Sequence, residues 1–463
     1  MKPTLRDVAL PQFGTPADRP ELPAALYAAR LNRLVSRMRQ QGLDLICIYG
    51  DREHAANISY LTGFDPRFEE ALLIVPAKGD PAILVGPENM GMAAQSPLQL
   101  DIRLYPPFGL MGQTRELTRV LSDLLNQLGV TSGLKIGLAG WKYFGALESS
   151  TPEQWFTEPS YLVDTVRGLV GPNGRVVNAT ALLMHSIDGL RAINEIEQLA
   201  AFEFAACHTS NGIVRVLKGL RPGMREFEAA ALLSPIGLPL SCHPMLSSGP
   251  RAALGLSSPG NRVIEHGDPL TAGYGVWGAL NCRAGFVIAD AGELPSEASD
   301  YLSKLVEPYF GAVAEWYQTA GIGVPGGDLD RIVRARLGDP FFGVSLNPGH
   351  LIHIDEWMNT PIYKDSTEPL MSGHAIQVDI IPATGTPYFT TNIEDGIALL
   401  DQRGRDEFAQ TYPAAWNRIQ ARRAFMADVI GIELKPEVLP FSNMPAWLPP
   451  FLLATGQAMV MAP

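Results

Sequence analysis

Cysteine is scarce in this chain. The 463 residues include only four cysteines and no CxxC pair; they are Cys47, Cys207, Cys242 and Cys282. This spacing argues against a disulfide framework and a structural zinc site, so reduced thiols are expected. Long apolar runs are also missing, since no stretch of about 18 uncharged apolar residues could span a bilayer. The first residues, MKPTLRD, lack the apolar segment of a signal peptide, which predicts a cytoplasmic protein.

Basic residues are outnumbered. The chain has 36 Lys and Arg against 48 Asp and Glu, a formal net charge of -12. No basic stripe is available to neutralise phosphates, so neither nucleic acid nor an anionic membrane is an expected partner. The acidic balance favours a small neutral or cationic ligand. With 46% hydrophobic residues the chain can bury a real core, and its length suits two domains.

The first part of the chain alternates helical and strand patterns. Apolar residues recur on one face of residues 23–41, and Gly42 supplies a stop. A second helix is predicted over 113–128, and strands are predicted over 43–49, 72–75, 82–85 and 135–138. This alternation predicts an α/β domain that ends near residue 185.

The pattern changes after residue 186. Two amphipathic helices, over 194–217 and 225–233, precede strand-like runs at 269–275, 286–289, 375–382 and 396–400. Paired helices before such strands predict an α+β domain over 186–432. In the last stretch, 433–463, five prolines interrupt the apolar residues, which predicts an extended arm over an apolar surface.

Several segments together resemble one family. Residues 57–64 read NISYLTGF, 194–197 read NEIE and 223–228 read GMREFE; 248–254 (SGPRAAL), Gly349-His350 and Ile393-Glu394-Asp395 follow in order. This series resembles the creatinase, aminopeptidase P and prolidase family. The resemblance implies a creatinase/prolidase-type N-terminal domain, then an α+β "pita-bread" catalytic domain, and a homodimer.

The family's catalytic domain normally holds two metal ions through two Asp, one His and two Glu, which together activate a bridging water. Here the first Asp position falls on Gly273, and the second on Cys282 or, with a shift of one residue, on Asn281. The His position matches His350. The two Glu positions correspond to Asp379 and Glu394. The resemblance therefore implies a degenerate metal site, with no cofactor expected and one divalent ion as an alternative.

A second departure concerns the histidine that the family places seven residues after the glycine of its Ser-Gly segment. Counting from Gly249 reaches Leu256, which cannot transfer a proton. The sequence thus differs from the metallopeptidases and from creatinase alike.

Ionisable residues gather around the family positions. His350, His353 and Glu356 lie within seven residues, and Asp379 lies in an apolar strand where a carboxylate needs a partner. The expected catalytic residues are His350, Asp379, Glu394, His353 and Glu356, or a metal set of His350, Asp379 and Glu394. If these three side chains converge, the neighbouring carboxylates should raise the pKa of His350. Asp355-Glu356 as a solvated turn is the simpler alternative.

Four further residues are candidates for substrate binding. Cys282 lies beside Arg283, whose charge would favour the thiolate, although an inert buried cysteine is the alternative. His243 precedes Pro244 on the way to the Ser-Gly segment. Arg67 lies in a charged loop that family dimers bring near the partner's cleft, or it is a plain surface residue.

Three functions fit these residues. The first is a creatinase-like hydrolase that acts on a C–N bond of a small polar substrate without the two-metal centre, with His350 as acid or base. The second is an Xaa-Pro peptidase-type metallohydrolase, with Cys282 as a fourth ligand if only one ion is held. The third is a non-catalytic binding protein on the same fold.

Overall fold

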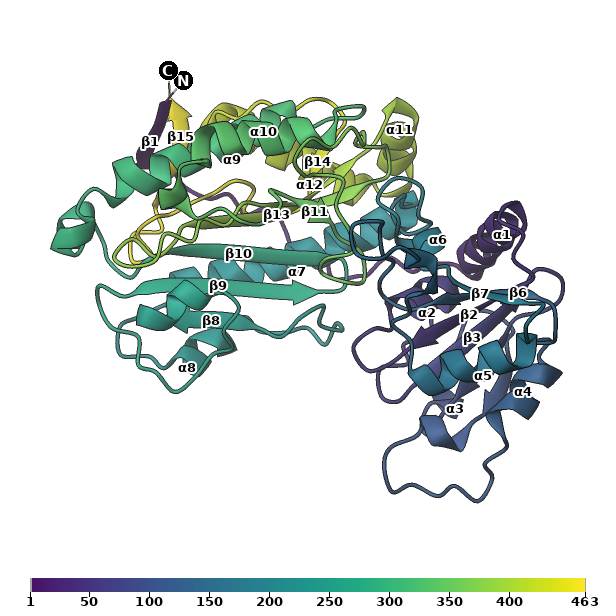
Figure 1. The fold of residues 1–463 in the computed structure, drawn as a ribbon. Coiled ribbons are helices and arrows are strands. Elements are labelled where there is room, and N and C mark those ends of the chain that lie inside the picture. Colours follow the sequence, from purple (N-terminus) through teal and green to yellow (C-terminus); the bar gives the residue numbers. More distant parts are fainter. Residues whose placement is uncertain (1, 463) are drawn as a thin grey trace. The chain divides into compact units, whose positions relative to one another are not determined.

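A computed structural model describes residues 2–462, which form two compact units. Residues 22–192 make up the first, called here the N-terminal unit. Residues 2–21 together with 193–462 make up the second, called the site unit. Each unit has its own large β-sheet (Figure 1).

The N-terminal unit is built on a six-stranded sheet of order β5-β4-β3-β2-β6-β7. Its strands are β2 (Leu45–Gly50), β3 (Ala71–Pro76), β4 (Ala82–Val85), β5 (Asp101–Leu104), β6 (Lys135–Ala139) and β7 (Arg175–Asn178). Its helices are α1 (Ala24–Gln40), α2 (Ala56–Thr62), α3 (Met90–Ala93), α4 (Leu121–Gln127), α5 (Ser160–Val170) and α6 (Ala181–Met184). β2 runs parallel to β6 and antiparallel to β3, so the sheet is mixed.

Local sequence accounts for most of these elements. Every residue of β2 is buried, as its apolar run predicts for a central strand. The predicted helix over 113–128 is wrong in its first half, because α4 begins only at Leu121. Leu117 and Val120 are exposed, and the helix forms only where Leu121, Leu124 and Leu125 enter the core.

The site unit contains a sheet of order β11-β12-β13-β10-β9-β8, with β14 paired to β13. The strands are β8 (Met245–Ser248), β9 (Pro269–Val276), β10 (Ala279–Phe286), β11 (His350–Leu351), β12 (Ala375–Asp379), β13 (Asn392–Leu399) and β14 (Val438–Pro440). The helices are α7 (Ile196–Gly219), α8 (Glu226–Ala231), α9 (Glu307–Thr319), α10 (Gly326–Leu337), α11 (Gln402–Thr411) and α12 (Pro413–Phe425). The strand predicted over 286–289 is misplaced, since β10 ends at Phe286.

Helices α7 and α9 cover one face of this sheet, called here the helix-covered face. Thr209 of α7 donates a hydrogen bond to the Asn281 side chain, and Tyr309 of α9 accepts one from the Ile393 amide. Successive strand residues point to opposite faces. Gly273, Cys282 and Glu394 therefore lie on the other face, called the site face.

The two ends of the chain meet in the site unit. β1 (Lys2–Asp7) pairs antiparallel with β15 (Gln457–Ala462), with Lys2 opposite Ala462 and Asp7 opposite Gln457. Residues 2–21 thus join residues 193–462 rather than the N-terminal unit in which the sequence analysis placed them. A short strand such as β1 does not reveal its partner, because the pairing spans the whole chain.

The C-terminal segment is part of the same compact unit. Trp447 and Phe451 are buried, at 0% and 1% exposure, and the Phe286 amide donates to the Pro450 carbonyl. The arm therefore covers its own unit. Its apolar side chains Trp447 and Phe451 are therefore buried within the unit.

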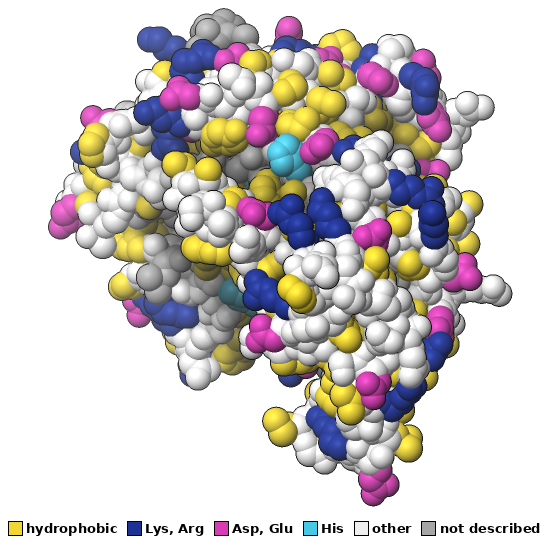
Figure 2. Space-filling view, turned by 45° about the vertical axis from the view of Figure 1, so that its right-hand side comes forward, with side chains coloured by type: hydrophobic (Ala, Val, Ile, Leu, Met, Phe, Trp, Pro, Cys, Tyr) yellow, Lys and Arg dark blue, Asp and Glu magenta, His cyan; other side chains and the backbone are white. Residues whose placement is uncertain are grey.

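The surface mixes charges of both signs. Figure 2 shows Lys and Arg side chains interspersed with Asp and Glu on the face in view. Within residues 2–462, no helix combines the length and the apolar character that crossing a bilayer requires. The four cysteines are free thiols, three of them buried.

Candidate active site

The strand register brings the family positions into one row on the site face. Met245, Gly273, Cys282, Glu394 and Asp379 are successive cross-strand partners along β8, β9, β10, β13 and β12. Directly opposed residues point their side chains to the same face. His350 is opposite Gln377, two residues before Asp379, so its ring also lies on this face.

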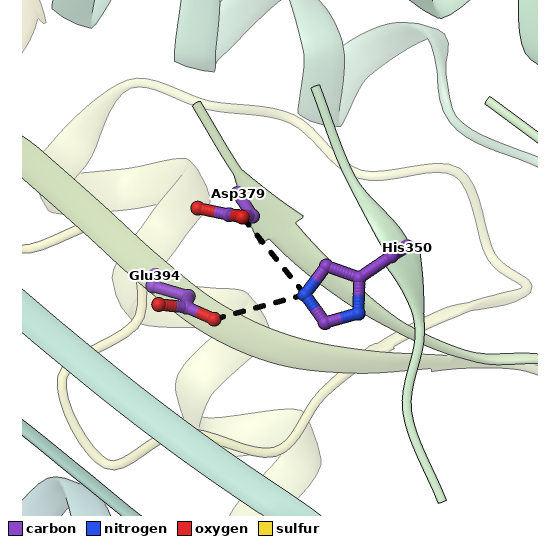
Figure 3. Close-up of side chains that lie close together, drawn as sticks. All are labelled: His350, Asp379 and Glu394. Carbon is purple, nitrogen blue, oxygen red and sulfur yellow. Dashed lines mark ion pairs between the residues drawn. The ribbon is translucent and has the colours of Figure 1, made fainter. Parts of the chain in front are cut away.

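Three of the expected residues converge there. His350 Nε2 lies 3.9 Å from Asp379 Oδ2 and 3.8 Å from Glu394 Oε1 (Figure 3). The ligand-type atoms of the three side chains all lie within 4.8 Å of one another, and all three residues are buried. The convergence expected from the sequence is present in the structure.

The imidazole of His350 is fixed from two sides. Trp357 stacks on it with 4.2 Å between ring centroids, and Nδ1 lies 3.3 Å from the Leu351 carbonyl oxygen. A carbonyl can only accept, so a proton on Nδ1 leaves the Nε2 lone pair facing the carboxylates. Glu356 Oε1 lies 3.2 Å from this Nε2, and its side chain is 25% exposed.

The cluster carries more negative than positive charge. Burial lowers the pKa of His350, but the nearby Glu356, Glu394 and Asp379 outweigh burial and raise it well above its usual range. Burial, followed by the charge of Asp379, raises the pKa of Glu394 well above its usual range. Burial likewise raises the pKa of Asp379. The site is therefore stabilised by a proton or by a bound cation.

The residues present fit one divalent ion. Asp379 Oδ1 is a buried side-chain atom with no hydrogen-bond partner among residues 2–462, while His350 Nε2 faces carboxylate oxygens of Glu356, Asp379 and Glu394 at 3.2, 3.9 and 3.8 Å. One imidazole nitrogen and two carboxylate oxygens form a donor set that suits Zn²⁺, Mn²⁺, Fe²⁺ or Co²⁺.

The positions of Gly273 and Cys282 do not provide carboxylate ligands for a second ion. A Cβ added at Gly273 would lie 2.8 Å from the Met245 methyl carbon and 3.6 Å from Cys282 Sγ. The space of a carboxylate side chain is thus filled by Met245. Burial, then the charges of Glu394 and Asp379, raise the pKa of the Cys282 thiol well above its usual range, which opposes the thiolate.

The register also separates Cys282 from Asn281. Cys282 is opposite Glu394 on the site face, whereas Asn281 lies on the helix-covered face. There the Asn281 amide donates to Asp395 Oδ1 at 2.9 Å and accepts from Thr209. Cys282, and not Asn281, therefore lies in the same row as Glu394 and Asp379.

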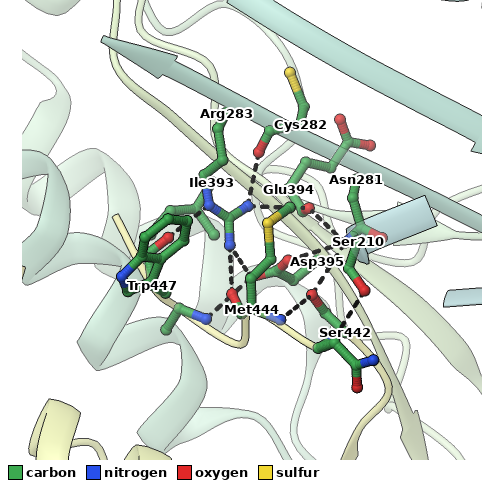
Figure 4. Close-up of polar contacts among 12 residues, drawn as sticks. Ser210, Asn281, Cys282, Arg283, Ile393, Glu394, Asp395, Ser442, Met444 and Trp447 are labelled. Atoms are coloured by element: carbon green, nitrogen blue, oxygen red, sulfur yellow. Dashed lines mark hydrogen bonds and ion pairs between the residues drawn. The ribbon is translucent and has the colours of Figure 1, made fainter. Parts of the chain in front are cut away.

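Arg283 does not line the site face. Its guanidinium pairs with Asp395 at 2.8 Å and donates to the carbonyls of Met444 and Trp447, both at 2.6 Å. Figure 4 shows this network on the side opposite the Cys282 thiol. Arg283 and Asp395 anchor the C-terminal segment, so the interpretation of Arg283 as a substrate ligand that activates Cys282 does not match its position.

The other sequence-predicted residues have contacts of their own. His353 packs edge-on against Phe202 of α7, and its Nδ1 accepts from the Ile354 amide. His243 is exposed and lies 2.7 Å from the Leu256 carbonyl oxygen, while the Leu256 side chain is 69% exposed. Arg67 belongs to the N-terminal unit, where it pairs with Asp65 at 3.0 Å.

Sequence reasoning missed Gln377. It lies on the site face two residues before Asp379, is fully buried, and donates to the Leu280 carbonyl. It can cross β13 because Gly396 opposite has no side chain; a Cβ there would lie 2.8 Å from Gln377 Oε1. Its spacing from Asp379 is the only signal that could have found it.

Comparisons with known proteins agree with this architecture. Residues 30–168 match the family model described as the creatinase/prolidase N-terminal domain. No curated protein sequence matches the chain.

Solved structures match over most of its length. The prolidase of Pyrococcus horikoshii OT3 has 15% identity and a TM-score of 0.62, covering 80% of this chain and 95% of its own. The prolidase of Thermococcus sibiricus has 17% identity and a TM-score of 0.64, and the match covers 81% of this chain and 95% of that prolidase. A variant of Escherichia coli aminopeptidase P has 14% identity and a TM-score of 0.56, and the match covers 85% of this chain and 99% of that protein. The predicted fold class is confirmed: the chain has a creatinase/prolidase-type N-terminal domain followed by the pita-bread fold of prolidases and aminopeptidase P.

Proposed function

We propose that this protein is a pita-bread hydrolase that cleaves a C–N bond, of the amide or amidine kind, in a small polar substrate with the help of a single divalent ion. The observation that carries the proposal is the convergence of the ligand atoms of His350, Asp379 and Glu394 within 4.8 Å, with Asp379 Oδ1 buried and without a hydrogen bond among residues 2–462. The neighbouring folds bear the names prolidase, Xaa-Pro dipeptidase and aminopeptidase P, all of which act on C–N bonds.

Each residue has a defined task. His350, Asp379 and Glu394 would hold the ion, which would supply Lewis-acid polarisation and an activated water. Trp357 and the Leu351 carbonyl keep the His350 ring oriented. Glu356 is the partly exposed carboxylate beside the cluster, so it is placed to accept and return a proton.

A metal-free route is the second candidate. The same Nε2 that would bind an ion lies 3.2 Å from Glu356 Oε1, the distance of an imidazolium–carboxylate pair. A charged His350 could then donate a proton to the leaving nitrogen, in the manner expected of a creatinase-like enzyme. A binding protein without catalysis is the third reading.

Metal content separates these readings. We expect mass spectrometry of protein purified without chelator to find about one divalent ion per chain, and none after His350→Ala. His266→Ala, a change to an exposed histidine of the same unit, is the matched control and should keep the ion. No ion in the wild type supports the metal-free route, and two ions per chain contradict the proposed single site.

Activity completes the test. Xaa-Pro dipeptides, N-acyl amino acids and amidino or ureido acids should be assayed with the metal-loaded protein and with Glu356→Gln. We expect one of these classes to be hydrolysed and the variant to lose about 10²–10⁴-fold in rate. Metal binding without any hydrolysis would leave the binding-protein reading.

The second-ion position can be tested by rebuilding it. The triple variant Met245→Ala, Gly273→Asp and Cys282→Asp removes the obstructing methyl and restores two carboxylates. We expect its metal content to rise from about one ion to about two per chain. A content that stays at one means that the position is closed by more than these three side chains.

We propose a homodimer from the family resemblance, and a cytoplasmic location from the sequence. Light scattering at micromolar concentration should give twice the chain mass of 50.2 kDa. A monomeric mass would remove the dimer, and with it the proposed role of Arg67 in a partner's cleft.

A further inference from the structure

One carboxylate beside the cluster comes from a loop rather than from a strand of the sheet. Residues 352–357, called here the site loop, follow Leu351, and the chain then turns back so that the Leu351 amide donates to the Asn359 carbonyl at 2.7 Å. Trp357 of this loop stacks on the imidazole of the cluster, and Glu356 directly precedes it. The stacked indole therefore holds the site loop, and with it Glu356, against the imidazole.

Glu356 is closer to His350 than the two strand carboxylates are. Its Oε1 lies 3.2 Å from His350 Nε2, whereas Asp379 Oδ2 and Glu394 Oε1 lie at 3.9 and 3.8 Å. Burial is the largest cause of the raised pKa of Asp379 and of Glu394, and the charge of Glu356 also raises both. Glu356 thus lies within electrostatic reach of every member of the cluster.

A separation of 3.2 Å is typical of two ligands of one ion. Zn²⁺ binds imidazole nitrogen and carboxylate oxygen at about 2.0–2.2 Å, so two such ligands lie about 3.4 Å apart in a tetrahedral shell and about 2.9 Å apart in an octahedral one. Glu356 Oε1 and His350 Nε2 fall between these values. Asp379 and Glu394 need to approach Nε2 by about 0.5 Å to do the same.

An ion on the imidazole changes what Glu356 can do. The ring proton lies on Nδ1, which faces the Leu351 carbonyl, so the Nε2 lone pair faces the carboxylates. Without an ion, a second proton on Nε2 gives Glu356 a hydrogen bond to accept. With an ion on that lone pair, no proton remains there, and a carboxylate oxygen 3.2 Å from Nε2 is stabilised only by sharing the cation.

The neighbouring strands leave a ligand position to fill. Zn²⁺ in proteins usually takes four ligands, and the cluster of one imidazole and two carboxylates supplies three. At the next positions along the row, β9 and β10 offer Gly273 and Cys282, and burial raises the pKa of the Cys282 thiol. Glu356 is not one of the three side chains whose ligand atoms lie within 4.8 Å of one another, so it must turn inward to bind. Its side chain is 25% exposed and is not locked by packing.

From these contacts we propose that Glu356 is a fourth protein ligand of the divalent ion, which the site loop supplies in place of the carboxylates that β9 and β10 lack. The inference rests on the proposed single-ion hydrolase. It gives Glu356 two states: a ligand in the resting protein, and a free carboxylate for proton transfer once a substrate has displaced it. The site loop and the ion then hold each other in place.

The test measures ion affinity and does not depend on activity. The full chain is treated with chelator, freed of it and titrated with Co²⁺ by calorimetry. Glu356→Gln removes the charge and keeps the length, whereas Glu356→Asp keeps the charge and shortens the side chain by one methylene. We expect both variants to bind one Co²⁺ per chain at least about 100-fold more weakly than the wild type, because residues outside the ligand set cost about 10–100-fold.

Asp355→Asn is the matched control, since it removes the same charge from the same loop. We expect its Kd for Co²⁺ to stay within about threefold of the wild-type value, because a charge that does not touch the ion is screened. The ligand role is wrong if Asp355→Asn weakens binding as much as Glu356→Gln, or if Glu356→Asp binds as the wild type does. Either result would show that charge at a distance accounts for the effect.

The visible absorption of bound Co²⁺ separates this inference from the proposed function. At saturating Co²⁺, Glu356→Gln should change the spectrum, and Asp355→Asn should leave it as in the wild type. A wild type that binds no Co²⁺ refutes the single-ion site and the fourth ligand together. A wild type that binds one Co²⁺, with Kd and spectrum unchanged in Glu356→Gln, refutes the fourth ligand and leaves the single-ion site standing.

Discussion

The two faces of the site unit's sheet use the same strands for opposite purposes. On the helix-covered face, Asn281, Arg283 and Asp395 bind one another and the C-terminal segment. On the site face, the neighbouring residues Cys282 and Glu394 join a cluster in which Asp379 Oδ1 is buried without a hydrogen-bond partner among residues 2–462. Buried polar groups that are fully hydrogen-bonded hold the fold together, whereas buried polar groups without partners can still bind a ligand.

The largest expected loss of stability follows from breaking the buried ion pair of Arg283 and Asp395. Arg283→Met leaves Asp395 buried and charged, so we expect a loss of about 3–5 kcal/mol in the free energy of unfolding by urea titration. Glu394→Gln on the site face should cost far less, since it removes a carboxylate that burial and Asp379 already disfavour. Equal losses of unfolding free energy in the two variants would mean that the two faces of the sheet contribute equally to stability.

Glu203 is a second buried carboxylate that pairs with arginines, and its contribution to stability should depend on pH. Burial alone would raise the pKa of Glu203, but Arg422 and Arg418 outweigh burial and lower it. A folded-state pKa below the unfolded value adds stability above the unfolded pKa, and this stability is lost as pH falls through the folded pKa. Glu203→Gln should therefore be destabilised by about 3 kcal/mol at pH 7, because two arginines lose their partner.

Acid titration provides the control for this change. We expect the difference in unfolding free energy between wild type and Glu203→Gln to shrink as pH drops below about 4.3, the pKa of an unfolded glutamate, and to disappear once Glu203 is protonated in the folded state as well. A difference that stays constant down to acid pH would show that packing, not charge, accounts for the loss.

A divalent ion should stabilise the folded protein only when its ligands on the site face are present. At a free ion concentration of about 100 times Kd, binding should add about 2.7 kcal/mol to the unfolding free energy of the wild type. Asp379→Ala should show no such gain, and Asp395→Ala should keep a gain while starting from a lower stability. Thermal unfolding with and without chelator measures both.

The smallest effect compares two threonines. Thr209 donates to Asn281 at 2.7 Å, while Thr271 Oγ1 has no hydrogen-bond partner among residues 2–462. Thr209→Val should cost about 1–2 kcal/mol, and Thr271→Val should lie within about 0.5 kcal/mol of the wild type without ligand. The reverse order would mean that Thr271 is satisfied in solution by ordered water.

The sequence by itself determined the candidates. Motif order indicated the fold class and pointed to His350, Asp379 and Glu394, because local patterns and short motifs need no knowledge of distant partners. It also indicated that Gly273 carries no ligand. Its prolines argued against a helix in the C-terminal segment.

Only the tertiary structure decided which side chains meet. Strand register depends on pairings between residues far apart in the chain, and a slip of one residue moves a side chain to the other face. Register placed Cys282 in the site and Asn281 and Arg283 behind it, and it set Met245 against Gly273. The same pairings aligned Ser247, Thr271 and Asn392, three polar residues whose separation in sequence gave no sign that they share one row.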